Sequence, residues 1–241
     1  MKATKLSFFS FILVLSISSY AKSLVKMTID GNKLGIAYEK TDQSKEVKAA
    51  GMIPRGSALI TDSGELKSSG ITHIIHAATG SMTKSSEAFK PTLEGITNSI
   101  INSISLAHEF KHKTIAIPFL GGGIFLGSLG LLKKELAKNI IQAALNNNPH
   151  KLIISFVTWS SEETRVFKDL YQKLVKDNSK YKVVRGSITD FNIHKSSVIV
   201  NAANMEVIFG GGLSGVIGEA TKSSTKIDSS AKKFIEKFNE P

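Results

Sequence analysis

The amino-acid sequence predicts an α/β fold, because short apolar runs alternate with segments of helical periodicity. Two of the apolar runs, residues 114–118 and 198–200, are each followed by three consecutive glycines and then by a segment that can begin a helix. Glycines at such a turn let backbone amides approach a phosphate, and a helix N-terminus favours negative charge. Each unit therefore indicates either an anion site or a plain structural turn, since glycine is also frequent in turns without a ligand.

The length and composition indicate one globular domain with a sizeable core. The chain has 241 residues, of which 41% are hydrophobic and 21% charged, and its formal net charge is +11. A basic surface attracts phosphate-bearing ligands or acidic partners. Nucleic-acid binding and a generally basic soluble protein both fit this charge. The lysines are spread along the chain with little aromatic interleaving, which favours the second interpretation.

Residues 1–21 are typical of a secretory signal peptide. Lys2 and Lys5 precede an apolar core at 6–17, and Ser19-Tyr20-Ala21, with a small residue on either side of the tyrosine, forms a cleavage site. We expect export to the periplasm or the medium, and delivery into a host cell is a further hypothesis. An uncleaved membrane anchor is the alternative, but the apolar core is short for a span; after cleavage we expect no stable membrane span.

The sequence contains no cysteine, which excludes disulfides, a cysteine nucleophile, thiolate metal sites and a lipid-modified cysteine. The six histidines have neither H-x-x-x-H nor H-E-x-x-H spacing, so we expect no zinc and no other metal.

The chain in order predicts strands and helices that fit one sheet-based domain. Residues 22–44 form an N-terminal extension, in which two apolar runs flank Asp30-Gly31-Asn32, a signal for a β-hairpin. A helical turn at 45–50 follows. Further strands are predicted at 57–61, 71–77, 114–118, 151–157, 183–184 and 198–200, and helices at 93–107, 131–145, 162–176 and 229–238.

Three side chains at predicted strand ends allow both a structural and a functional interpretation. His76 can be a catalytic base or a satisfied core histidine, and we favour the core histidine. Trp159, the only tryptophan, can stack on a base or fill the core. Asn204 can bond a sugar hydroxyl through its amide or cap the next helix.

Four motifs within residues 182–221 resemble the macrodomain family when they are taken together. They are Gly186-Ser187-Ile188-Thr189, Val200-Asn201-Ala202-Ala203-Asn204, Gly210-Gly211-Gly212 and Gly215-Val216-Ile217. The resemblance implies a three-layer α/β/α sandwich with a mixed central sheet. It also implies binding of ADP-ribose, which some family members hydrolyse from proteins or from its acetyl ester.

The order of the motifs resembles a circularly permuted macrodomain spanning residues 45–241. Elements that come late in the family occupy 45–176, and the elements that usually open the domain follow at 181–221. Two incomplete macrodomains side by side are the competing arrangement. We reject that arrangement because each part would lack half of its sheet and have a poor core.

The resemblance also implies roles for individual residues. Ser187, Ile188 and Trp159 would lie beside the adenine, and Phe125 would cover the distal ribose, whose hydroxyls Asn204 would bond. The family usually has an acid at the position of Ser187, for which nearby Asp190 is a possible substitute. The implied ligand contacts are Ser187, Ile188, Ala202, Asn204, Gly210, Gly211, Gly212, Leu213, Ser214, Gly215, Val216, Leu120, Gly121, Gly122, Gly123, Ile124, Phe125 and Trp159.

The first functional hypothesis is an exported mono-ADP-ribosylhydrolase, a bacterial effector that cleaves the glycosidic or ester linkage to modified side chains. Its partner is ADP-ribose or a mono-ADP-ribosylated protein, it needs no cofactor, and we expect a monomer. Ser214 stands where some family hydrolases have a loop aspartate. The chain is closer to active viral macrodomains, in which the substrate's phosphate is proposed to orient the water and Asn204 would be catalytic. The alternatives are a non-catalytic ADP-ribose reader and, on charge alone, a nucleic-acid binder.

Overall fold

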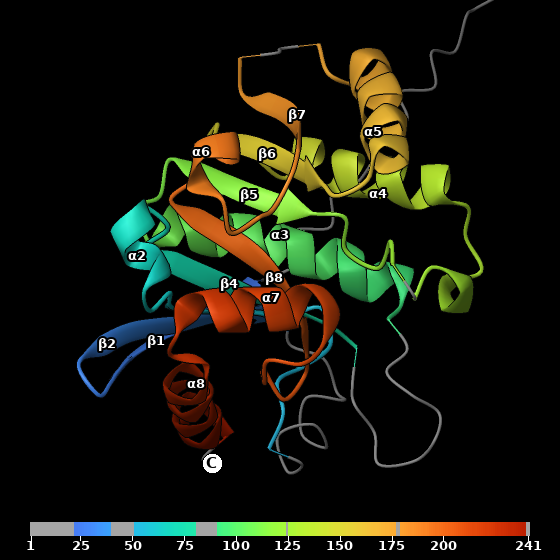
Figure 1. The fold of residues 1–241 in the computed structure, drawn as a ribbon. Helices are drawn as coiled ribbons and strands as arrows, with labels where there is room; N and C mark the ends of the chain where they lie inside the picture. The colour runs from blue at the N-terminus through green and yellow to red at the C-terminus, as the bar shows by residue number, and fades with distance from the viewer. Residues whose placement is uncertain (1–21, 40–50, 81–90, 124, 177–178, 240–241) are drawn as a thin grey trace, which may run out of the picture.

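The computed structural model describes residues 22–39, 51–80, 91–123, 125–176 and 179–239, and its centre is a mixed sheet (Figure 1). The predicted signal peptide, the helical turn at 45–50 and Ile124 lie outside the described residues. The sheet is eight-stranded and has the order β1-β2-β3-β4-β8-β5-β6-β7. Its strands are β1 (Lys22–Ile29), β2 (Asn32–Glu39), β3 (Ala58–Asp62), β4 (His73–Gly80), β5 (Thr114–Pro118), β6 (Ile153–Thr158), β7 (Tyr181–Arg185) and β8 (Val198–Asn204).

The strands from β4 to β7 in the sheet order are parallel, whereas β1, β2 and β3 pair antiparallel with their neighbours. The last strand of the chain, β8, lies between β4 and β5, and its apolar residues 198–200 are fully buried, as a central parallel strand requires. Strand β4 continues beyond the predicted 71–77 because its pairing with β8 continues to Gly80, opposite Asn204. Strand β5 ends at Pro118, which has no amide hydrogen for further pairing.

Strands β1 and β2 form a hairpin that extends the sheet. At its turn Asp30 and Gly31 have φ values of 48° and 80°, and positive φ at both positions is the geometry of a type I′ turn. Strand β2 continues the sheet by pairing with β3, with Ile36 opposite Leu59. The hairpin is therefore part of the same sheet as the rest of the chain.

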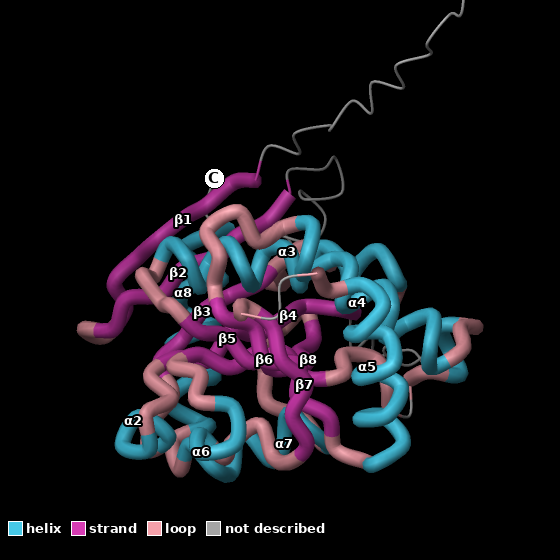
Figure 2. The backbone as a smooth tube through the Cα atoms, turned by 90° about the horizontal axis from the view of Figure 1, so that it is seen from above, coloured by secondary structure: helices cyan, strands magenta, loops and turns pink. Residues whose placement is uncertain are grey.

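Helices cover both faces of the sheet and complete three layers (Figure 2). One face packs against α3 (Leu93–Glu109), α4 (Lys133–Asn146) and α5 (Ser161–Leu174). The other face packs against α2 (Leu66–Ser69), α6 (Phe191–His194), α7 (Gly212–Thr221) and α8 (Ser224–Asn239). Within the described residues, no helix has the length and apolar character needed to cross a bilayer.

Candidate functional site

A cavity of ≈340 Å³ lies at the carboxyl ends of β5, β6 and β7, beside the first turn of α7. Strand ends of this kind are where ligands bind in open α/β sheets. The cavity brings together six of the contacts predicted from the sequence: Trp159, Ser187, Ile188, Gly212, Leu213 and Val216. The other lining residues, which were not among the predicted contacts, are Pro118, Phe119, Val157, Thr158, Glu163 and Gly186.

Trp159 is an exposed wall of this cavity and is not a core residue. Its relative exposure is 74%, far above that of a packed core side chain, although it directly follows the buried strand β6. Val216 on α7 is also exposed, at 49%, and lines the same cavity. An exposed indole at a cavity wall offers a flat apolar surface on which an aromatic ligand can stack.

The loop after β5 reaches the cavity with its first residues. Pro118 and Phe119 line the cavity, while Leu120 is fully buried in the core. Gly121 has a φ of 75°, and a Cβ on Gly122 would collide with the ring of Phe119. The glycines are therefore required for this tight turn, but Gly121, Gly122, Gly123 and Phe125 do not line the cavity.

The loop after β8 reaches the cavity through the first turn of α7. Gly212 has a φ of 59° and begins the helix, with Gly211 as its N-cap. A Cβ on Gly215 would come within 2.8 Å of the Gly210 carbonyl oxygen, so the helix turn packs closely on the loop. The first backbone amides of a helix have no partner within the helix, and here they lie beside the cavity.

A chain of buried hydrogen bonds connects the sheet to this glycine loop. The Thr61 hydroxyl donates to the carbonyl oxygen of the next residue (3.1 Å), so it accepts from Nε2 of His76 (2.9 Å). Nδ1 of His76 is then the acceptor for Nδ2 of Asn201 (3.3 Å). The same Asn201 nitrogen donates to Oγ of Ser214 (3.1 Å), which also accepts from the Gly210 amide (3.3 Å).

His76 is the core histidine that the sequence favoured. It is fully buried, and burial lowers the pKa of His76 to about 3. A neutral imidazole with both ring nitrogens bonded has no lone pair left to act as a base. Its role in this structure is to hold Asn201, and through it the first turn of α7.

Asn204, the predicted catalytic residue, bonds its own loop. Its Nδ2 donates to the Ile208 carbonyl oxygen (3.3 Å), and its Oδ1 accepts from the Ile208 amide (3.1 Å). Between them Val207 has a φ of 55°, which is strained for a β-branched residue. Asn204 therefore closes this strained turn; neither it nor Ala202 lines the cavity, and the same is true of Gly210, Gly211, Ser214 and Gly215.

The resemblance implied an acid beside the adenine, at the position of Ser187, with Asp190 as a possible substitute. Neither residue places a carboxyl group in the cavity. The Ser187 hydroxyl bonds Oγ1 of Thr189 (2.7 Å) within its own turn. Asp190 is exposed and accepts from the Asn192 amide (2.9 Å) as the cap of α6. The carboxyl group in the cavity lining is that of Glu163. Sequence reasoning missed it, although Ser160-x-x-Glu163 is a capping-box signal.

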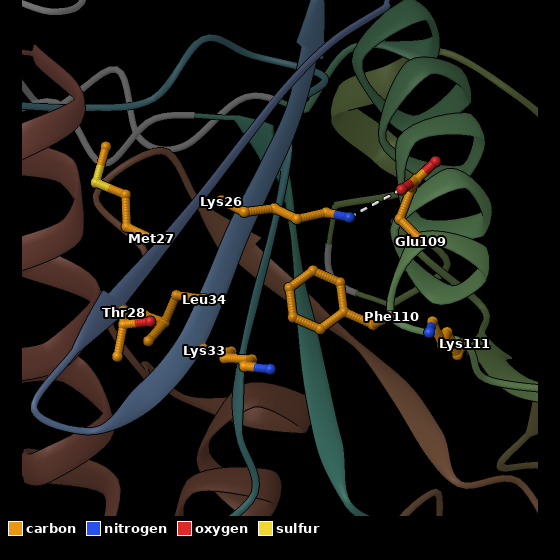
Figure 3. A pocket seen from close by; sticks show the side chains of 8 residues that line it. All are labelled: Lys26, Met27, Thr28, Lys33, Leu34, Glu109, Phe110 and Lys111. Atoms are coloured by element: carbon orange, nitrogen blue, oxygen red, sulfur yellow. Dashed lines mark hydrogen bonds and ion pairs between the residues drawn. The ribbon is translucent and has the colours of Figure 1, made fainter.

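A second, larger cavity lies between the β1–β2 hairpin and the end of α3 (Figure 3). Its volume is ≈520 Å³, and Nζ of Lys26 lies 2.9 Å from the Glu109 carboxylate and 5.7 Å from the centre of the Phe110 ring. None of the predicted ligand contacts lies there. The lining residues are Lys26, Met27, Thr28, Lys33, Leu34, Glu109, Phe110 and Lys111. In neither cavity, nor elsewhere in the described part of the chain, do three His, Asp or Glu side chains gather as a metal site would need.

A comparison with protein families matches residues 33–131 to the model described as Macro domain. No match to a curated protein is found. The matched residues run from β2 to just beyond Gly130 and include the loop after β5. Strands β7 and β8 and helix α7 lie outside the match, but β8 pairs with both β4 and β5 inside it.

Proposed function

The chain carries a macrodomain, and from this premise we propose that it binds ADP-ribose in the strand-end cavity and releases ADP-ribose from modified protein side chains. One observation carries the proposal. The cavity is assembled from the loop after β5, the residues after β6 and β7, and the first turn of α7. These segments are far apart in the sequence, and they include the residues that the family resemblance assigns to the base.

The adenine and the diphosphate of ADP-ribose each have a matching surface in the cavity. The adenine stacks on the exposed indole of Trp159, beside Ile188. The diphosphate lies at the N-terminal turn of α7, where backbone amides and the helix dipole favour negative charge. Cleavage after residue 21 removes Lys2 and Lys5 and no acid, and the remaining net charge of 11 − 2 = +9 adds an attraction for a dianionic ligand.

Hydrolysis requires water to attack the anomeric carbon of the distal ribose. The new carbon–oxygen bond forms as the bond to the protein side chain breaks, the side chain leaves with the bonding electron pair, and the proton of the attacking water passes to the substrate's phosphate. Ser214 is buried and its oxygen accepts two hydrogen bonds, so it does not supply a base. In the proposed mechanism the substrate's own phosphate orients the water, and Asn204 orients the ribose on the strained turn.

A non-catalytic ADP-ribose reader is the second candidate, and one observation favours it. Both polar atoms of the Asn204 side chain are bonded to Ile208, so the predicted catalytic amide already has its partners within the loop. A reader needs only the cavity, whereas a hydrolase must also place Asn204 against the ribose.

We further propose that the domain is a circularly permuted macrodomain. The family match ends before β7 and β8, yet β8 is hydrogen-bonded between β4 and β5, both of which the match includes. Moving the β7–β8–α7 unit to the front of the chain would restore the family's usual order without changing the sheet. A chain with its ends joined and reopened before β7 should fold with the same cavity; loss of folding in that variant would count against this proposal.

Export and action inside a host cell rest on residues 1–21 alone. We propose cleavage after residue 21 and release from the cytoplasm of the producing cell. Fractionation of that cell, with the N-terminus of the mature protein determined by sequencing, tests both points. Recovery of the uncleaved chain solely in the cytoplasm would overturn them.

The experiment that tests the function measures ADP-ribose released from a panel of mono-ADP-ribosylated proteins. Release should occur with the parent chain and fall at least about tenfold with Asn204→Ala, about 1.4 kcal/mol of lost transition-state stabilisation. Asn146→Ala, an exposed position at the end of α4, is the matched control and should retain the parent activity. ADP-ribose binding by calorimetry without release establishes the reader. If neither binding nor release occurs, the proposed function is wrong.

A further inference from the structure

Glu163 places a carboxylate in the strand-end cavity while one of its oxygens holds the adjacent backbone. Oε2 accepts from the amides of Trp159 (2.9 Å) and Ser160 (3.2 Å), and Oγ of Ser160 accepts in return from the Glu163 amide (3.1 Å). This capping box fixes the carboxylate beside the main chain of Trp159, whose amide it accepts from. Its other oxygen, Oε1, has no hydrogen-bond partner within the described ranges.

Among the described residues that line the cavity, no other side chain carries a carboxyl group. Ser187 lines the same cavity, but its hydroxyl is bonded to Thr189. Asp190 does not line the cavity and caps α6 instead. A ligand group that donates a hydrogen bond at this end of the cavity therefore meets the free oxygen of Glu163 as its anionic acceptor.

We propose that Oε1 of Glu163 accepts from the 6-amino group of the base stacked on Trp159, and that this contact selects adenine over 6-oxo purines. This inference rests on the proposed ADP-ribose binding and deepens it. Adenine presents a donor at position 6, whereas hypoxanthine presents a carbonyl oxygen. Two acceptors facing each other would leave a desolvated carboxylate oxygen unpaired, which binding sites that read a donor discriminate against strongly.

The capping box makes the effect of one substitution directional. Glutamine has a single acceptor oxygen, and the amides of Trp159 and Ser160 both require it. Glu163→Gln therefore keeps its oxygen in the capping box and turns its NH₂ group toward the cavity. The cavity then presents a donor where the parent presents an acceptor, so the preference should shift from the 6-amino to the 6-oxo base.

The test is calorimetric titration of the full chain with ADP-ribose and with inosine diphosphate ribose, which differ at position 6 of the purine. The parent should bind ADP-ribose at least roughly tenfold more tightly, and Glu163→Gln should lower this ratio by at least roughly tenfold. Glu162→Gln is the matched control, because Glu162 is exposed, does not line the cavity, and pairs with Lys133 (2.7 Å). Its affinity ratio should equal that of the parent. Thermal unfolding of each variant verifies that the fold is intact.

The outcomes separate this inference from the proposed function. If the parent binds ADP-ribose but Glu163→Gln weakens both ligands equally, Glu163 contacts the ribose or supports the loop, and the base-selecting role is overturned. An unchanged ratio in Glu163→Gln overturns it as well. If the parent binds neither nucleotide, the proposed function falls and this inference falls with it.

Discussion

Replacing His76 with glutamine should remove part of the acid sensitivity of the fold. His76 is fully buried, and burial lowers its pKa from 6.5 to about 3. Between these two values the unfolded chain binds a proton that the folded chain does not, so stability falls as the pH falls through this window. Lowering the pH from 7 to 5 should therefore cost the parent about 2 kcal/mol through His76 alone.

Urea unfolding at pH 7 and pH 5 measures this loss in the parent and in His76→Gln. The variant starts from a lower stability, so the readout is the loss of unfolding free energy between pH 7 and pH 5. This loss should be about 2 kcal/mol smaller in the variant than in the parent. His73, His112 and His194, whose pKa values burial also lowers, remain in both proteins and contribute to the residual sensitivity. The exposed His150, changed to glutamine, is the control. An equal acid loss in the parent and in His76→Gln would refute the reasoning.

Two further substitutions test the loops around the site. Ser214→Ala removes the acceptor of the Gly210 amide, so it should lower the free energy of unfolding by about 1–3 kcal/mol in urea titrations. It should also weaken ADP-ribose binding. Unchanged stability and affinity would contradict this prediction. Gly64→Ala should lower the free energy of unfolding by more than about 2 kcal/mol, because Gly64 has a φ of 56° and a Cβ there would collide with the Thr221 carbonyl oxygen. Gly31→Ala, at the open hairpin turn, should lower it by only about 1–2 kcal/mol. Equal losses at the two glycines would exclude the collision as the cause.

The strands and helices were largely predictable because their signals are local. The apolar runs at 114–118 and 198–200 lie in β5 and β8, and Pro118 ends its strand where its missing amide hydrogen predicts. The end of β4 was not predictable from its own residues. Pairing with β8, more than a hundred residues later, extends it to Gly80. Long-range pairing can therefore extend a strand to residues that the local sequence pattern does not include.

The residues proposed to contact the adenine were predicted better than those proposed to act at the ribose. Trp159, Ser187 and Ile188 follow strand ends and do line one cavity. Glu163 was missed because its spacing from Ser160 predicts only the start of a helix, and the fold is needed to place its side chain in the cavity lining. The pairing of Asn204 with Ile208 depends on the left-handed Val207, a conformation that the sequence does not predict for valine.

The central strand of the sheet is also the last one to be synthesised. Until residue 204 has emerged, β4 and β5 both have an open edge, and the apolar faces on either side of the gap lack the strand that joins them. The contacts that close the sheet join residues more than eighty positions apart, so chain closure must precede them and folding should be slow. A chain truncated before β8 should therefore lack a continuous sheet, because β4 and β5 are joined only through β8.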